Sequence, residues 1–177
     1  MYRFIPLIEP LSPFIRLIKD IGFPMVIVPF HEIVKHGLVD DIVYYGINRV
    51  LGYEGYVLLS SIMPDGMLND ETFSLFLEVA IRGRFYGVIG WDMPVYADVP
   101  LDESWNNLVI SIDKTLELAK SGINTIPLAR GVNREQVETG LNAYVKAGFK
   151  TIALHVSDYI YAYRSDPLAR ETFPYFS

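Results

Sequence analysis

Short apolar runs alternate with amphipathic segments along this chain, and the alternation occurs six times. Each apolar run has the length of a buried strand, and the segment after it carries apolar residues at helical spacing. Because a helix separates each strand from the next, the pattern predicts parallel strands with helices packed against the sheet. The predicted strands span residues 4–8, 23–28, 56–59, 86–90, 125–128 and 151–154.

Residues that favour helix ends stand between these strands. Serine and asparagine predict helix starts because their side chains accept hydrogen bonds from free backbone N–H groups, and glycine predicts a helix end. The predicted end residues are Ser12 with Pro13, Asn69, Gly83, Ser121 with Gly122, and Asn133 with Gln136. The helix after Asn133 is expected to bury an apolar face made of Val137, Leu141, Tyr144 and Val145.

The segment after the first predicted strand decides between two parallel architectures. A doubly wound sheet usually carries a glycine-rich phosphate loop there, whereas this chain reads Glu9-Pro10-Leu11-Ser12-Pro13. The expected fold class is therefore α/β, with a parallel (β/α) TIM-barrel-like sheet of about six units, incomplete relative to a full eight-unit barrel. Its two open sheet edges must be covered by the tail, by a second copy or by another subunit.

Length and composition indicate one domain. With 177 residues, of which 51% are hydrophobic, the chain can bury a single core, so residues 1–177 are expected to form one barrel-like domain. Residues 159–177 are rich in aromatic side chains and contain Pro167 and Pro174, which indicates an irregular tail.

No apolar stretch approaches the roughly 20 residues of a membrane span, and no signal peptide is recognisable. We therefore expect a cytoplasmic protein without a membrane partner.

Charge and cysteine content limit the chemistry. The absence of cysteine excludes disulfides, thiol nucleophiles and thiolate metal sites. The formal net charge of −6 gives no general attraction to a phosphate backbone, so nucleic-acid binding would need a local basic patch or a basic partner. No metal and no cofactor are expected.

Polar residues follow the predicted strands, and parallel strands bring these positions to one edge of the sheet. Each of them alone could cap a helix or satisfy a backbone amide, but together they define a candidate site. In chain order they are Glu9, His31, Glu32, Ser60, Ser61, Asp65, Trp91, Asp92, Asp98, Arg130, His155, Ser157 and Asp158.

Asp92 is the most specific of these candidates. It follows an apolar strand beside Trp91, and its carboxylate can accept two hydrogen bonds from an amidine-like or guanidine-like edge. Arg130 could hold an anion, stack on a ring, or form an ion pair with Asp92 or Asp158. His155 could act as a general base with Asp158 nearby, or it could be a core histidine bonded to a backbone carbonyl.

Several chemistries are excluded by spacing. His31 and His36 are five residues apart, so they do not share the face of a zinc-binding helix. No lysine ends a strand at the expected active edge, which argues against Schiff-base chemistry. Ser60 and Ser61 lack the glycine-flanked turn that exposes a hydrolase serine, and the chain has no Walker-type loop.

The third to sixth units resemble the barrel of the tRNA-guanine transglycosylase family, which exchanges guanine in RNA for a deazaguanine base. The similar segments are Trp91-Asp92-Met93-Pro94, Leu116-Glu117-Leu118-Ala119, Pro127-Leu128-Ala129-Arg130-Gly131 and Ala147-Gly148-Phe149. In the family the acid after the fourth strand grips the base edge, and the resemblance carries this role to Asp92. It implies a purine or 7-deazaguanine ligand and a glycosyltransferase type of reaction.

The chain departs from the family at other site positions. Ser60 and Ser61 stand where the family has Asp-Ser-Gly-Gly-Phe, and Arg130 replaces a glutamine. We expect these three residues, with Trp91 and Asp158, to contact the substrate. The family's nucleophilic aspartate lies beyond the sixth strand, and its cysteine-rich zinc site is missing here, so the resemblance implies a partner subunit for catalysis.

Three functions remain open from the sequence. The first is a transglycosylase-like protein that binds a purine-like base through Asp92. The second is a small barrel-type lyase or hydrolase that uses His155 as general base, with Asp92 or Asp158 orienting a substrate or a metal. Asp92 and His155 are the expected catalytic residues, with His155 taking part only in the second hypothesis. The third is a non-catalytic scaffold that forms a homo-oligomer through its open barrel edges.

Overall fold

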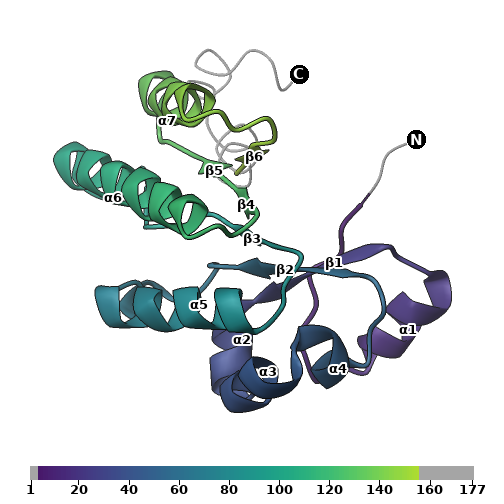
Figure 1. Cartoon of the computed structure of the whole chain (residues 1–177). Coiled ribbons are helices and arrows are strands. Elements are labelled where there is room, and N and C mark those ends of the chain that lie inside the picture. Colours follow the sequence, from purple (N-terminus) through teal and green to yellow (C-terminus); the bar gives the residue numbers. More distant parts are fainter. Residues whose placement is uncertain (1–3, 156–177) are drawn as a thin grey trace.

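The computed structural model describes residues 4–155, which form a mixed α/β fold with parallel sheets (Figure 1). One sheet has four strands, β1 (Met25–Pro29), β2 (Tyr56–Ser60), β3 (Gly87–Ile89) and β4 (Thr125–Ile126). A small second sheet has two strands, β5 (Leu128–Ala129) and β6 (Ala153–Leu154). The predicted aromatic tail at 159–177 lies outside the described residues.

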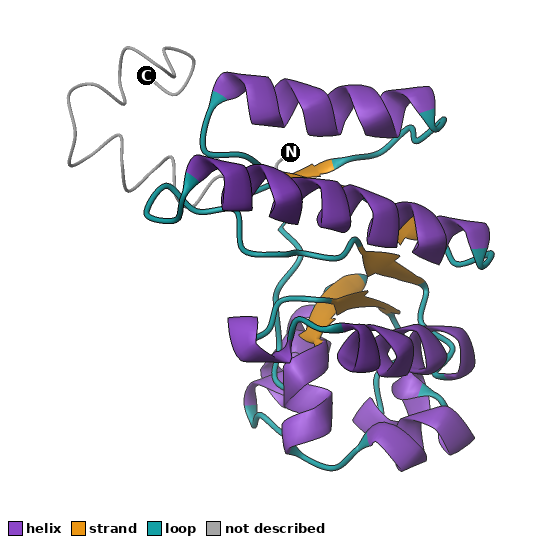
Figure 2. Ribbon diagram, turned by 90° about the vertical axis from the view of Figure 1, so that its left-hand side faces the viewer, coloured by secondary structure: helices purple, strands orange, loops and turns teal. Residues whose placement is uncertain are grey.

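The segments between the strands are helical, as predicted. The three longest helices are α5 (Asp70–Arg82), α6 (Leu101–Lys120) and α7 (Arg134–Lys146). Figures 1 and 2 show them stacked in chain order alongside the strands. The shorter elements are α1 (Phe14–Ile21), α2 (Phe30–Lys35), α3 (Val39–Tyr45), α4 (Ile47–Leu51) and the 3-10 turn η1 (Asp65–Met67). Within residues 4–155, no helix combines the length and the apolar character that a bilayer crossing requires.

Strands that are neighbours in a sheet are also consecutive in the chain. β1 pairs with β2, β2 with β3, β3 with β4, and β5 with β6, always in parallel. The first predicted strand is reduced to one bridge between Leu7 and Ile27. In that bridge Ile8 N donates to Ile27 O and Ile27 N donates to Pro6 O, each at 2.8 Å. Within residues 4–155 the strand order therefore shows no reversal of the kind that defines a doubly wound sheet.

The fifth predicted strand is interrupted at Pro127, which separates β4 from β5. Proline has no backbone N–H and so cannot donate to a neighbouring strand. Its carbonyl still accepts from Ala153 N at 2.8 Å, and Ala129 O accepts from His155 N at 3.0 Å. The chain thus passes from β4 of the four-stranded sheet to β5 of the two-stranded sheet, with only Pro127 between them.

One face of the strands is covered by helices and forms the main core. Its register brings Val28, Leu59 and Val88 side by side, and all three side chains are fully buried. On the opposite face, Ile27 and Ile126 are only partly buried. Leu58 of β2 also lies on this opposite face but is only 2% exposed, so β2 is buried on both faces and reads as a continuous apolar run.

Asparagine caps begin two of the long helices, as the sequence predicts. Asn69 Oδ1 accepts from Thr72 N at 2.9 Å, and Asn133 Oδ1 accepts from Gln136 N at 2.9 Å. The Gln136 side chain forms a variant of the capping box, in which its Oε1 accepts at 2.8 Å from the N–H of Val132, the residue before the cap. Side-chain oxygens thus satisfy N–H groups that the first turn of each helix leaves open.

The inner face of α7 differs from the prediction. Val145 was expected to be buried, but its side chain is 61% exposed. The buried residues of α7 are Gln136, Gly140 and Tyr144, which repeat every four positions and form one stripe. The prediction was wrong because Gln136 turns inward, where its Nε2 donates to Ser104 Oγ of α6 at 3.1 Å, and this orientation turns Val145 outward.

Candidate functional site

Asp92 and Arg130 come into contact where the chain leaves β3 and β5. Arg130 Nη1 lies 2.5 Å from Asp92 Oδ1, and the two side chains are 5% and 11% exposed. Asp92 follows β3 and Arg130 directly follows β5, so the shared edge joins residues that lie 38 positions apart. This ion pair is one of the alternatives that the sequence offered for Arg130.

Arg130 also holds the backbone of the loop after β3. Its Nη1 donates to Met93 O at 3.4 Å, and its Nη2 donates to Val95 O at 3.3 Å. A guanidinium group presents its donors as a rigid planar fork, so one side chain fixes the carboxylate and the loop together. Arg130 is therefore placed to position Asp92.

Tyr96 covers Arg130 from the same loop. The guanidinium carbon lies 5.2 Å from the centre of the Tyr96 ring, and the Tyr96 hydroxyl donates to Asp65 Oδ1 at 3.3 Å. Burial raises the pKa of Tyr96, and the Asp65 carboxylate raises it further, whereas Arg130 acts in the opposite direction. Tyr96 is thus a neutral donor that joins the loops after β2 and β3. Tyr96 was not among the residues predicted from the sequence, although its position four residues after Asp92 was a usable signal.

Polar side chains of α6 support the same loop from behind. Thr115 Oγ1 accepts from Trp91 N at 3.1 Å, and Ser111 Oγ accepts from Met93 N at 3.0 Å. Asn107 Nδ2 donates to Pro94 O at 2.7 Å. A loop that leaves the sheet loses its strand partners, and α6 replaces these partners with buried hydroxyl and amide groups.

Gly90 allows this close approach of the loop to α6. A side-chain carbon at this position would lie 2.6 Å from Thr115 Oγ1 and 3.2 Å from Leu128 N. The first distance would require the Thr115 side chain to move, and the second would require the backbone at Leu128 to shift by a few tenths of an ångström. The turn from β3 into the Asp92 loop therefore requires glycine for space.

Trp91 lies in the hydrophobic core, with its side chain only 1% exposed. Its ring packs edge-on against Phe73 and Phe76 of α5, at centroid distances of 5.1 Å and 5.6 Å. Its indole N–H points to Met93 Sδ at 3.3 Å. The structure thus places Trp91 on the helix side of the sheet, where it anchors the start of the loop.

Ser60 and Ser61 are buried at the end of β2 and contact backbone atoms. Ser61 Oγ donates to Gly90 O at 2.6 Å, and Ser60 Oγ accepts from Ile62 N at 3.2 Å. The Ser61 contact ties the loop after β2 to the end of β3, and the Ser60 contact is local to that loop. Both hydroxyls therefore have a structural role. The contact of Ser60 and Ser61 with a substrate stays a prediction.

His155 stands next to Arg130 at the same edge. Its backbone N–H donates to Ala129 O at 3.0 Å, and its side chain is partly exposed. The register of β5 and β6 therefore places His155 on the strand beside Arg130. The predicted site residues Ser157 and Asp158 lie outside the described residues.

The remaining rim candidates lie apart from Asp92 in the contact network. Glu9 and Asp98 are exposed, and His31 and Glu32 form a separate cluster on α2. Among residues 4–155, no group of three or more histidine or acidic side chains is arranged to hold a metal ion. A cleft lined by Tyr86, Asn124, Phe149 and Lys150 opens at the amino-terminal ends of the strands, opposite the Asp92 edge.

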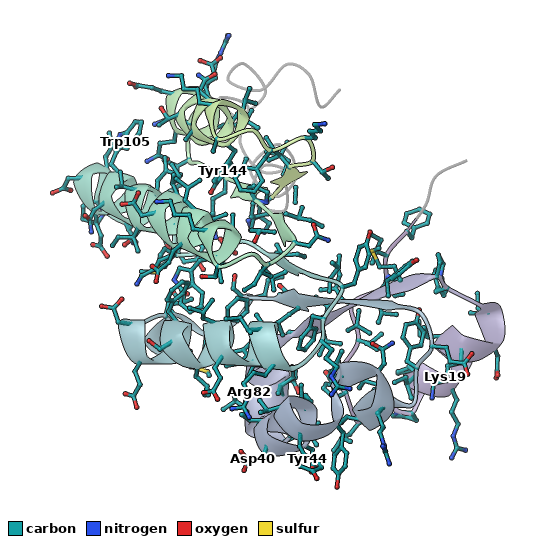
Figure 3. All side chains as sticks on the ribbon, viewed as in Figure 1. Lys19, Asp40, Tyr44, Arg82, Trp105 and Tyr144 are labelled. Atoms are coloured by element: carbon teal, nitrogen blue, oxygen red, sulfur yellow. The ribbon has the colours of Figure 1, made fainter. Side chains whose placement is uncertain are left out.

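Tyr144 of α7 has a buried hydroxyl near Asp92 and Thr115. Figure 3 shows Tyr144 on the side of α7 that faces α6 and the strands. Within the described part of the chain its hydroxyl has no hydrogen-bond partner within 3.5 Å. Burial raises the pKa of Tyr144 to about 12, the charge of Asp92 adds to this, and the nearby Thr115 hydroxyl acts in the opposite direction.

Replacing Tyr144 by phenylalanine is expected to leave stability unchanged or raise it by up to about 1 kcal/mol, because removing an unpaired buried hydroxyl removes its desolvation cost. Urea unfolding at neutral pH measures this effect. Tyr53→Phe is the matched control, since the Tyr53 hydroxyl donates to Phe23 O at 2.5 Å. The control should lose about 1 kcal/mol. Equal losses in both variants would contradict the assignment.

The same variant should change the response to alkali. An unfolded tyrosine ionises near pH 10, whereas the folded pKa of Tyr144 is about 12, so stability is lost as the pH rises between these values. The wild-type stability should fall more steeply there than that of Tyr144→Phe, by up to about 1.4 kcal/mol per pH unit. Parallel curves for the two proteins would show that Tyr144 ionises freely.

No protein-family model matches the chain, and no curated protein matches its sequence. The function therefore has to be argued from the geometry at the Asp92 edge.

Proposed function

We propose that the protein is a (β/α) barrel-type protein, similar to the tRNA-guanine transglycosylases, that binds a purine or 7-deazaguanine base through Asp92. The strand order supports the barrel, because consecutive strands are neighbours in the sheets without a reversal. The position of Asp92 supports the site, because enzymes of this architecture place their chemistry at the carboxyl ends of the strands.

The observation that carries the proposal is the fixed carboxylate of Asp92. Arg130 and the α6 side chains hold it at the rim, yet its side chain remains 11% exposed. A carboxylate has two oxygens with about four lone-pair positions, so the bond from Arg130 leaves acceptor capacity. Guanine presents a ring N–H beside an amino group, which is an edge of two adjacent donors. Asp92 can accept from both.

The charge of the pair favours a neutral ligand. A lone carboxylate at this position would attract cations, but Arg130 neutralises Asp92 at short range. The pair then offers directional hydrogen bonding without net charge. This property suits an uncharged base with donors along one edge better than a metal ion or an amine.

Base exchange would need further groups. In the family that the sequence resembles, the nucleophilic aspartate lies beyond the sixth strand, and the overall charge of −6 here does not favour a polyanion. We propose that this chain supplies the base-binding half of the site. A partner subunit would supply the nucleophile and the positive surface for tRNA.

Isothermal titration calorimetry with guanine and 7-deazaguanine tests the proposal. Asp92→Asn keeps an oxygen for Arg130 but places an amide N–H₂ where the base needs an acceptor, so binding should weaken at least about tenfold. Asp98→Asn is the matched control, because Asp98 is exposed on the same loop. Adenine lacks the paired donors and should not bind. Absence of guanine binding by the wild type, or equal binding by Asp92→Asn, would overturn the proposal.

A further inference from the structure

A cleft of about 610 Å³ opens at the amino-terminal ends of the strands. Its volume lies in the range of small-molecule sites, which is about 300–1,000 Å³. Its apolar lining includes Met25 at the start of β1 and Ile126 of β4. Asp92 lies beyond the opposite ends of the strands, so this cleft is a separate site.

Two aromatic rings line the cleft from different segments. Tyr86 stands directly before β3 with its side chain 47% exposed, and its ring centre lies 4.3 Å from that of Tyr56. Phe149 stands before β6, where its ring packs edge-on against Tyr144 at 6.0 Å and its N–H donates to Tyr144 O at 3.1 Å. Both rings are thus held by neighbours. A planar ligand can stack on such rings whatever its hydrogen-bonding pattern.

Lys150 gives the cleft a positive charge. It lines the cleft from the loop between α7 and β6, and its side chain is exposed. Within residues 4–155 its ammonium group has no carboxylate within 4.0 Å. The lining contains no acidic residue, so the cleft favours an anionic group although the whole chain carries a net charge of −6.

The helices that lead into the cleft end in further lysines. α6 ends at Lys120 and α7 at Lys146, and both side chains are exposed. Cations are favourable at these positions because a helix carries partial negative charge at its carboxyl end. The loops that follow, 121–124 and 147–152, contain no acidic residue. The positive charge of Lys150 is therefore extended along this edge of the sheets.

Asn124 and Thr151 add hydrogen-bonding groups to the lining. Asn124 Nδ2 donates to Tyr86 O at 2.9 Å, which leaves the Asn124 Oδ1 as an acceptor. Thr151 is exposed beside Lys150, and its hydroxyl can donate or accept. A ligand that suits this lining has a planar ring with N–H donors and an anionic group that accepts hydrogen bonds.

We propose that this cleft binds a nucleotide, whose base stacks on Tyr86 and Phe149 and whose phosphate pairs with Lys150 and Thr151. A nucleotide combines the two features that the lining selects, a flat heteroaromatic ring and a charged group with several acceptor oxygens. The nucleotide is either free or an unpaired residue of an RNA strand, and both present the same chemistry. The site does not rest on the proposed role of Asp92.

Isothermal titration calorimetry of the full chain with adenosine 5′-monophosphate (AMP) tests the site. Adenine lacks the paired donors that the Asp92 site requires, so this probe reports on the cleft alone. AMP should bind at least about tenfold more tightly than adenosine or ribose 5-phosphate, because each of these lacks one of the two contacts. Absence of AMP binding, or equal affinities for AMP and adenosine, would overturn the proposal.

Two pairs of variants locate the phosphate and the base. Lys150→Gln should weaken AMP binding about tenfold and leave adenosine binding unchanged. Its matched control is Arg84→Gln, because Arg84 is an exposed cation before β3 whose side chain lies against Gly46, outside the cleft. Tyr86→Leu should weaken the binding of AMP and of adenosine about tenfold, whereas Tyr44→Leu on α3 should change neither. Equal losses within either pair would contradict the assignment.

Two further arms identify the source of the nucleotide and separate the two sites. A short oligoadenylate that binds more tightly than AMP would assign the cleft to an RNA strand, and one that does not would assign it to a free nucleotide. Asp92→Asn should leave AMP binding unchanged, and its loss in this variant would overturn the separate site. AMP binding without guanine binding would refute the proposed function and leave the nucleotide site standing.

Discussion

Replacing Arg130 by methionine is expected to destabilise the protein by about 3–5 kcal/mol, the usual cost of removing one partner of a buried ion pair. The variant leaves the Asp92 carboxylate without its counter-charge, with only 11% of that side chain exposed to water. It also deprives Met93 O and Val95 O of their donors. Urea unfolding, followed by circular dichroism, gives the change in the free energy of unfolding.

A double variant shows whether the loss arises from the pair. Asp92→Asn combined with Arg130→Met removes the stranded charge, so it should recover about 1–3 kcal/mol of the single-variant loss. Arg82→Met is the matched control, because Arg82 forms an exposed ion pair with Glu78 on α5. That control should lose no more than about 0.5 kcal/mol. A loss at Arg130 as small as the control's would mean that the pair does not organise this edge.

Trp91→Ala is expected to cost about 3–5 kcal/mol, because it leaves a large cavity between β3 and α5. The indole is enclosed by Phe73 and Phe76 and is almost completely buried. Trp91→Phe keeps part of this packing and should lose less. The free energy of unfolding, measured in urea for each variant, checks both values.

The same variants decide between a structural and a substrate-binding role for Trp91. With Trp91 in the core, Trp91→Phe should bind guanine as the wild type does under conditions in which both are folded. Trp105→Ala is the matched control, since Trp105 is only partly buried on α6 and should cost less than Trp91→Ala. Weaker ligand binding by a fully stable Trp91→Phe variant would support the sequence-based expectation instead.

The alternation of strands and helices could be predicted because buried parallel strands are apolar at nearly every position. Tyr56–Ser60 is an example, in which four consecutive residues are buried. The starts of α5 and α7 were also predictable, because asparagine marks a helix start through a local hydrogen bond. The position of Asp92 at the sheet edge could also be predicted, because residues that follow parallel strands gather at one edge of the sheet.

The side chains that hold the Asp92 loop in place could not be predicted in the same way. Ser104, Asn107, Ser111 and Thr115 repeat at helical spacing on α6 and are all buried. Polar residues at this spacing normally indicate a solvent-facing surface, and only the contacts with the loop reveal that these face inward. The ion pair of Asp92 with Arg130 was weighed as one alternative, but sequence spacing contains no information on which acid an arginine meets. The split of the fifth strand at Pro127 likewise depends on the partners on both sides.

The loop that carries Asp92 takes its hydrogen bonds from the helix that follows it in the chain. The three contacts to Thr115, Ser111 and Asn107 span 24, 18 and 13 residues. Residues 87–120 therefore supply most of the hydrogen bonds that shape this loop. Arg130 lies outside this segment and adds the contacts to Asp92, Met93 O and Val95 O. Substitutions at position 130 consequently remove these contacts, while the three bonds from α6 to the backbone of residues 91–94 remain available.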